Sequence, residues 1–180
     1  MQIRPIVITL VLLNMAFGPE PVRAGEVIAP SPLQQRSESF TIALAGPVKE
    51  ATPLFGPMRE TEWAPDWKPR FLHPANGAQH AGVVFTTTGA NGDERIWLLA
   101  NYDVDLGQVD YAVFTPGLVV NEIKIRVGAD GERHCKATIT YRRSALTVAG
   151  NAEVARLDSH WAEEQQNEWE RSINAVLTRR

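Results

Sequence analysis

The sequence has few of the residues that build metal sites. Its 180 residues include one cysteine and four histidines, so no disulfide can form within the chain. His73 and His80 lie close together, yet no H-E-x-x-H or C-x-x-C motif accompanies them, and Asn76-Gly77 between them indicates a loop. We therefore expect no metal site, and nothing in the sequence indicates a cofactor.

The usual patterns of nucleophilic catalysis are also missing. There is no G-x-S-x-G sequence. His134 and Cys135 are neighbours in the alternating run "HCKATITY", so on a strand their side chains point to opposite faces and do not form a Cys-His pair. Cys135 is better interpreted as a small, half-buried strand residue than as a reactive thiol.

No excess of basic charge is present. The chain has 18 Lys and Arg against 21 Asp and Glu, and the basic residues do not cluster. Phosphate backbones are bound by clustered Lys and Arg, so nucleic acid is not an expected partner.

The longest apolar run, Pro5 to Phe17, is too short to span a membrane, because about 20 residues are needed to cross the hydrocarbon. Arg4 precedes this run, and Val22 and Ala24 supply the small residues that signal peptidase reads, so residues 1–24 are predicted to be a secretory signal peptide. An uncleaved anchor is the alternative. Cleavage leaves a periplasmic or secreted protein without a stable membrane span, long enough for one domain; the sequence does not indicate its oligomeric state.

Residues 25–37 contain two prolines and no apolar periodicity, which predicts a flexible lead before a domain at 38–180. The pattern then changes to two-residue alternation, typical of half-buried strands joined by turns such as Asn91-Gly92, Pro116-Gly117 and Asp130-Gly131. Turns this short permit only antiparallel neighbours. The predicted strands lie in the segments SFTIALAG, AGVVFTTT, ERIWLLANYD, QVDYAVFT, LVVNEIKIRV and HCKATITYRR.

Two further segments favour helices. In "PVKEATPLFG", Pro47 suits a first helical turn, while Pro53 and Gly56 limit the helix to a turn or two. From residue 151 to 179 there is no glycine or proline, and apolar residues from Val154 to Leu177 recur at helical spacing. Asp158 or Ser159 would cap the regular part of this helix, whose apolar stripe must be covered by the sheet.

The order of these elements resembles the START-like, or SRPBCC, superfamily. The segments that show this resemblance are "PLFGPMRETEWAPDWKP", "AGVVFTTT", "ITYRRSALTVAG" and "WERSINAVL". They look like a bacterial exported subset of the superfamily with a P-x-R-E-x-x-W-x-P-x-W signature and a closing Y-x-x-T/S-A-L-x-x-x-G. The resemblance implies an α+β helix-grip fold: a curved antiparallel sheet of about seven strands wrapped on a long C-terminal helix, with short helices after the first strand. It also implies that "KPRFLHP", residues 68–74, is the seventh strand, and that a cavity for apolar molecules lies between sheet and helix.

Glu60, in the signature segment, has two interpretations. It either faces the cavity mouth, where burial raises its pKa and it binds or deprotonates a ligand, or it forms an ion pair with Arg59 or a helix-end cap. Trp63 and Trp67 likewise either line a pocket or plug the open end of the sheet as core. Four prolines in residues 57–74 make the segment rigid, as suits a wall.

The remaining cavity wall follows from alternation and strand pairing. Ile123 and Ile125 share a face, and pairing would bring Ile139 and Tyr141 to one side of them and the strand of Tyr111 to the other. Trp97 lies on a strand with two apolar faces, so it could point inward or outward. From the final helix we nominate Trp169, for which plain core packing is the alternative.

These observations predict an exported binding protein that holds a small apolar or aromatic molecule. One alternative is a cyclase- or hydratase-like enzyme that uses Glu60 or His73 as acid or base. The other is a domain without a cavity that binds another protein. The sequence does not identify a ligand.

Overall fold

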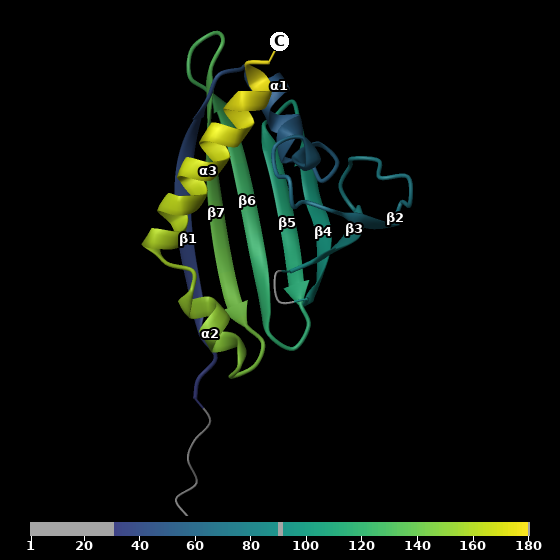
Figure 1. Ribbon diagram of the computed structural model, residues 1–180, viewed down its shortest axis with the longest axis vertical. Helices are drawn as coiled ribbons and strands as arrows, with labels where there is room; N and C mark the ends of the chain where they lie inside the picture. The colour runs from purple at the N-terminus through teal and green to yellow at the C-terminus, as the bar shows by residue number, and fades with distance from the viewer. Residues whose placement is uncertain (1–30, 90–91, 180) are drawn as a thin grey trace, which may run out of the picture.

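The computed structural model describes residues 31–89 and 92–179, and its framework is one antiparallel sheet (Figure 1). Seven strands follow the order β1-β7-β6-β5-β4-β3-β2. Their bounds are β1 Gln35–Leu44, β2 Arg70–His73, β3 Val84–Thr88, β4 Glu94–Asp103, β5 Gln108–Thr115, β6 Val119–Ala129 and β7 Cys135–Ala145. The predicted signal peptide and residues 25–30 of the predicted lead lie outside the described residues. Residues 35–37, which the sequence assigns to the lead, are paired with β7.

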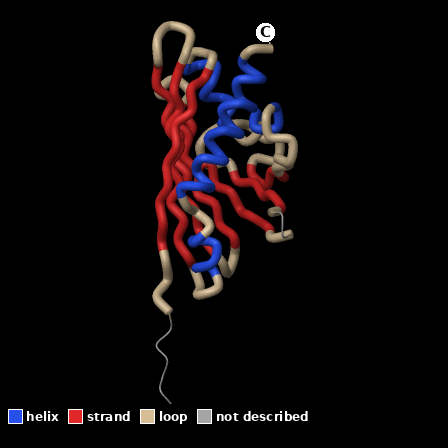
Figure 2. The backbone as a smooth tube through the Cα atoms, turned by 60° about the vertical axis from the view of Figure 1, so that its left-hand side comes forward, coloured by secondary structure: helices blue, strands red, loops and turns tan. Residues whose placement is uncertain are grey.

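The helices lie on one face of the sheet (Figure 2). Their bounds are α1 Val48–Ala51, the two 3-10 helices η1 Thr52–Phe55 and η2 Arg59–Glu62, α2 Gly150–Ala155 and α3 Ser159–Leu177. The α+β helix-grip arrangement, with short helices after the first strand and a long C-terminal helix, is therefore confirmed. Among the described helices, none is both long and apolar enough to cross a membrane.

Strand pairing follows the predicted alternation. Ile123 pairs with Tyr111 on β5 and with Tyr141 on β7, while Ile125 pairs with Ile139 on β7. These side chains lie on the face that the helices cover, and the intervening residues of β6 and β7 lie on the bare face. The seventh strand is also confirmed: β2 occupies the sheet edge beside β3, with an irregular register between Phe71 and His73.

The tight turns use glycine where the backbone needs a positive φ. Gly117 has φ 73° between β5 and β6, and Gly131 has φ 94° between β6 and β7. These conformations are open to glycine at little steric cost, which explains the predicted turns. Of the Asn91-Gly92 pair between β3 and β4, Asn91 lies outside the described residues.

The C-terminal apolar stripe forms two helices instead of one. Val154 lies in α2, and α3 begins only at Ser159. Asp158 has an extended backbone and its Oδ1 accepts a hydrogen bond from the backbone N–H of Trp161 at 2.9 Å, so it is the N-cap of α3. An N-cap needs a non-helical backbone, and this interrupts the stripe between α2 and α3.

The C-terminal half of α3 is hydrogen-bonded to the outer edge of β1. The side-chain amide of Asn174 accepts from the N–H of Ala45 and donates to the carbonyl of Ala43, both at 2.8 Å. A carboxylate oxygen of Glu170 accepts from the N–H of Ala43 at 2.9 Å. The buried side chains Ala162, Ile173 and Leu177 complete the contact of α3 with the sheet. This docking fixes the height of the helix above the sheet.

Candidate ligand-binding site

Two adjoining hollows lie between the sheet and the helices. The outer hollow, near α2 and the start of α3, has a volume of about 420 Å³, and the inner hollow, near η2, has about 190 Å³. Trp97, Ile123, Tyr141 and Gln165 line both, so the two spaces share a wall. Small-molecule sites usually measure about 300–1,000 Å³. The inner hollow alone is below this range, so a molecule of ordinary size that enters it must also extend into the outer hollow.

The inner hollow is lined mainly by aromatic side chains, and it gathers residues from η2, four strands and α3. Its lining residues are Glu60, Trp63, Ala64, Trp67, Trp97, Tyr111, Ile123, Ile125, Tyr141, Gln165, Glu168 and Trp169. The structure therefore brings together every ligand-binding residue nominated from the sequence except Ile139. Whether they contact a ligand stays a prediction.

Ile139 is fully buried and is not part of either wall. It pairs across the sheet with Phe40, whose ring packs edge-on against Trp161 and Trp169 of α3 at centroid distances of 6.3 and 5.6 Å. At this position the space between helix and sheet is filled by core side chains. Ile139 thus lies on the predicted face of the sheet but outside the walls of both hollows.

The indoles of Trp63 and Trp67 are hydrogen-bonded to backbone carbonyls that precede them in the chain. Trp63 is buried and donates its Nε1–H to the carbonyl of Leu54 at 2.7 Å. Trp67 donates to the carbonyl of Pro57, also at 2.7 Å. Each ring thus contributes an apolar surface to the hollow while its one polar group is satisfied behind it.

Trp97 and Tyr111 continue this aromatic wall along the sheet. Trp97 points inward: its ring packs edge-on against Trp67 at 5.0 Å and against Tyr111 at 5.6 Å, and its Nε1–H donates to Thr87 Oγ1 at 2.9 Å. The hydroxyl of Tyr111 donates to the carbonyl of Phe55 at 2.8 Å. Side chains held by packing and hydrogen bonds at once keep a preformed shape.

Glu60 is the buried carboxyl of the site, with 8% of its surface exposed. Among the described residues, none donates a hydrogen bond to its carboxyl oxygens or pairs with them. Burial raises the pKa of Glu60 well above its ordinary value, because no neighbouring cation compensates the lost hydration of the charged form. Its negative charge in turn contributes to the raised pKa of Tyr111 and of Tyr141.

The ion-pair interpretation of Arg59 and Glu60 is wrong. Arg59 pairs instead with Glu62: its Nη2 lies 2.9 Å from Glu62 Oε2, and its Nε contacts the other carboxylate oxygen. A 3-10 turn brings positions i and i+3 onto the same side, so Arg59 and Glu62 meet at the surface. Glu60, one position on, turns toward the hollow.

His73 and Cys135 lie away from both walls. His73 is an exposed residue of β2 at the sheet edge, so the structure does not bring it near Glu60. Burial raises the pKa of the Cys135 thiol to about 11, which leaves it protonated at neutral pH and a poor nucleophile. Within residues 31–89 and 92–179, no three or more His, Cys, Asp or Glu gather in a geometry that could hold a metal ion.

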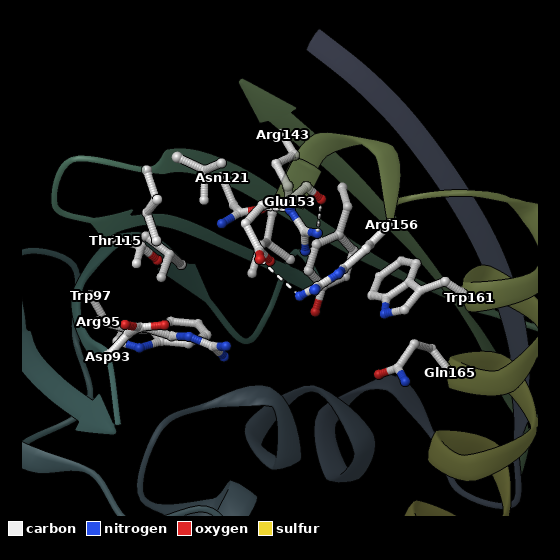
Figure 3. A pocket seen from close by; sticks show the side chains of 15 residues that line it. Asp93, Arg95, Trp97, Thr115, Asn121, Arg143, Glu153, Arg156, Trp161 and Gln165 are labelled. Atoms are coloured by element: carbon white, nitrogen blue, oxygen red, sulfur yellow. Dashed lines mark hydrogen bonds and ion pairs between the residues drawn. The ribbon is translucent and has the colours of Figure 1, made fainter. Parts of the chain in front are cut away.

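The outer hollow contains charged residues that the sequence analysis missed. Figure 3 shows Asp93 and Arg95 on the β4 side of this space, and Arg143, Glu153 and Arg156 on the opposite side. Arg143 follows Ile139 and Tyr141 at two-residue steps on β7, so the alternation that nominated those two also places Arg143 on the covered face.

Comparisons with solved structures show the fold. Truncated norcoclaurine synthase from Thalictrum flavum superposes with a TM-score of 0.62 and 11% sequence identity, over 85% of this chain and 99% of the synthase chain. A complex of that synthase with dopamine and hydroxybenzaldehyde gives 0.59 and 11%, over 95% and 96%. Ginseng major latex-like protein 151, from Panax ginseng, gives 0.58 and 16%, over 79% and 97%.

No family model matches the sequence, and no curated protein sequence matches it either. The solved structures are START-like proteins, so this chain has the helix-grip fold of the START-like superfamily. Sequence identities of 11 to 16% show only that the fold is shared.

Proposed function

We propose that this chain is an exported protein that binds a small apolar or aromatic molecule in the two hollows between the sheet and α3. The observation that carries the proposal is the inner hollow: rigid aromatic rings surround one buried carboxyl that has no partner among the described residues. Such a wall favours a flat apolar ligand, with Glu60 as the polar group that selects its orientation. Burial of apolar area would supply affinity at about 25 cal/mol per Å².

Two further observations support this proposal. The fold neighbours include a synthase whose structure holds two aromatic molecules, dopamine and hydroxybenzaldehyde. The N-terminal sequence pattern of a signal peptide is the basis for proposing export. The hollows themselves count against the alternative of a protein-interaction domain without a cavity.

The experiment fills the inner hollow. Ala64 lines it, so Ala64→Leu adds three carbon atoms to the space that the ligand would occupy. The fluorescent probe N-phenyl-1-naphthylamine should bind the wild-type protein and should bind the variant at least about tenfold more weakly, as expected when a bulky group blocks a pocket. Native mass spectrometry of the protein purified from its host should show a bound small molecule that the variant lacks.

A matched control separates pocket filling from a general effect of leucine. Ala175 is exposed on α3 and is not part of either hollow, so Ala175→Leu should bind the probe as the wild type does. Equal probe affinity in the wild type and Ala64→Leu, or the absence of probe binding and of any co-purified molecule, would refute the proposal.

One observation favours an enzyme as the second candidate. A buried carboxyl with a raised pKa, open to a ligand space, is the usual setting of a general acid or base. If Glu60 moves a proton to or from a carbon of the ligand, the co-purified ligand should gain deuterium when incubated in D₂O with the wild-type protein. Glu60→Gln should bind the ligand but not promote this exchange. Equal exchange by both proteins would exclude Glu60 as the proton carrier.

A further inference from the structure

The charges of the outer hollow are not balanced. Three arginines and two carboxylates line it. Nη1 of Arg156 lies 2.8 Å from Oε1 of Glu153, so these two charges form a pair. Neither Arg95 nor Arg143 lies within ion-pair distance of a carboxylate among the described residues.

Arg143 is held in place by neutral acceptors. Its Nε–H donates to Oδ1 of Asn121 at 2.7 Å, and its Nη1 donates to the backbone carbonyl of Glu153 at 2.9 Å (Figure 3). A guanidinium has five N–H donors in a planar fork, so three remain for a further acceptor. The two bonds fix the plane of the guanidinium between β6 and α2 without neutralising its charge.

The surroundings of Arg143 make its positive charge costly. Burial lowers the pKa of Arg143. Electrostatic interactions with Tyr141 and Glu153 oppose this in part, and the positive charges of Arg95 and Arg156 add to it. A partly buried cation beside two others is stabilised by an anion in direct contact, and no described carboxylate lies within ion-pair distance of Arg143. The residue instead lines an open space.

We propose that the outer hollow binds an acidic group, a carboxylate or sulfonate, carried by the ligand itself, and that Arg143 is its principal partner. This inference rests on the proposed function and specifies the chemical class of the ligand: an apolar or aromatic acid. Its acidic end lies at Arg143 with Arg95 across the hollow, and its apolar end passes Tyr141 and Trp97 into the inner hollow.

The two ends of the site fix this orientation. In the inner hollow a negative charge would lose its hydration without meeting a cation, because the inner walls offer none. At the outer end an acid meets guanidinium donors in a geometry suited to planar, two-oxygen recognition. A cationic or neutral ligand would leave Arg143 uncompensated.

A matched pair of probes tests the proposal. 1-Anilinonaphthalene-8-sulfonate and N-phenyl-1-naphthylamine share one ring system, and only the first carries an acidic group. In the wild-type protein the sulfonate should bind more tightly. Arg143→Gln should weaken the sulfonate about tenfold or more, as for a lost charge-assisted hydrogen bond, and should leave the neutral probe within about twofold. Raising NaCl from about 0.05 M to about 0.5 M should weaken the sulfonate alone.

Two more variants keep the test decisive. Arg142 is the next residue on β7, lies on the bare face and pairs with Glu122, so Arg142→Gln removes the same charge outside the hollow and should not change sulfonate binding. Because Arg143 also joins β6 to α2, its loss could disturb the fold. Arg95 is exposed and makes no hydrogen bond with another described side chain, so Arg95→Gln should weaken the sulfonate about threefold or more in a folded protein.

The outcomes separate this inference from the proposed function. Binding of the neutral probe with no selective loss of the sulfonate in Arg143→Gln and Arg95→Gln would overturn the acid site and leave the apolar site standing. Failure of both probes to bind the wild-type protein would overturn both proposals.

Discussion

The inner and outer hollows share four wall residues but are built in different ways. In the inner hollow, the polar groups of Trp63, Trp67 and Tyr111 donate to backbone carbonyls and leave apolar ring surface facing the space. In the outer hollow, arginine and carboxylate side chains line the space. Arg156 pairs with Glu153, and Arg143 bonds to Asn121 and to the backbone of α2. The inner wall is therefore part of the hydrophobic core, whereas the outer wall is a polar opening beside it.

The largest expected difference between the two walls concerns their tryptophans. Trp169 packs against Phe40, Phe55 and Trp63 at centroid distances of 5.6, 6.3 and 5.1 Å. Trp169→Ala should therefore lower the free energy of unfolding by about 3 kcal/mol or more, as for a core aromatic residue. Trp161→Ala, at the outer hollow, should cost only about half as much. Urea unfolding of both variants measures this, and equal losses would contradict the distinction between the walls.

The second prediction concerns the charge of Glu60. Because burial raises the pKa of Glu60 above its ordinary value of 4.5, the folded protein holds this proton more tightly than the unfolded chain does. The stability linked to this difference is fully present below about pH 4.5 and is lost as the pH rises toward the raised pKa of the folded state. Glutamine has no proton to lose, so Glu60→Gln keeps its stability as the pH rises. Between pH 4.5 and pH 8 its free energy of unfolding should therefore increase by about 1 kcal/mol or more relative to that of the wild type.

A control variant removes a carboxyl group from an exposed position of the inner hollow. Glu168 is exposed and also lines the inner hollow, and Glu168→Gln should follow the wild-type pH dependence of unfolding between pH 4.5 and pH 8. If Glu60→Gln also follows the wild type, the carboxyl is hydrated in solution and the inner hollow is wetter than its walls indicate.

The smallest expected effect compares two tyrosines. Tyr111 is buried and its hydroxyl donates to the Phe55 carbonyl, so Tyr111→Phe should cost about 1 kcal/mol of unfolding free energy and leave a buried acceptor without its donor. Tyr141 lines both hollows, and among the described residues its hydroxyl has no hydrogen-bond partner. Tyr141→Phe should stay within about 0.5 kcal/mol of the wild type. Thermal unfolding of both variants measures this. A larger loss of stability in Tyr141→Phe than in Tyr111→Phe would contradict the prediction.

The sheet could be predicted because alternation and turn chemistry are local properties. The apolar face of Ile123 and Ile125, its pairing with Tyr141 and the glycine turns all follow from residues close in sequence. The break before α3 was harder to place, because an apolar stripe continues through it and only the N-cap Asp158 marks the interruption.

The candidate site could be predicted only in part, since a hollow depends on side chains from distant segments. Alternation places Arg143 on the covered face, but it cannot show that open space remains there and that Asn121 and α2 hold the guanidinium. For Glu60 the missing information was the partner of Arg59. In a 3-10 turn Arg59 and Glu62 lie on the same side and pair with each other, which leaves Glu60 free to turn inward.

Asn174 has a consequence beyond docking. β1 is an outer strand of the sheet, and the exposed side of such a strand can recruit another extended chain and start aggregation. By binding the N–H of Ala45 and the carbonyl of Ala43, the amide of Asn174 takes up two backbone groups at the end of this edge that an incoming chain could otherwise bind. The helix that bounds the hollows thus also covers the open edge of the sheet at the end of β1.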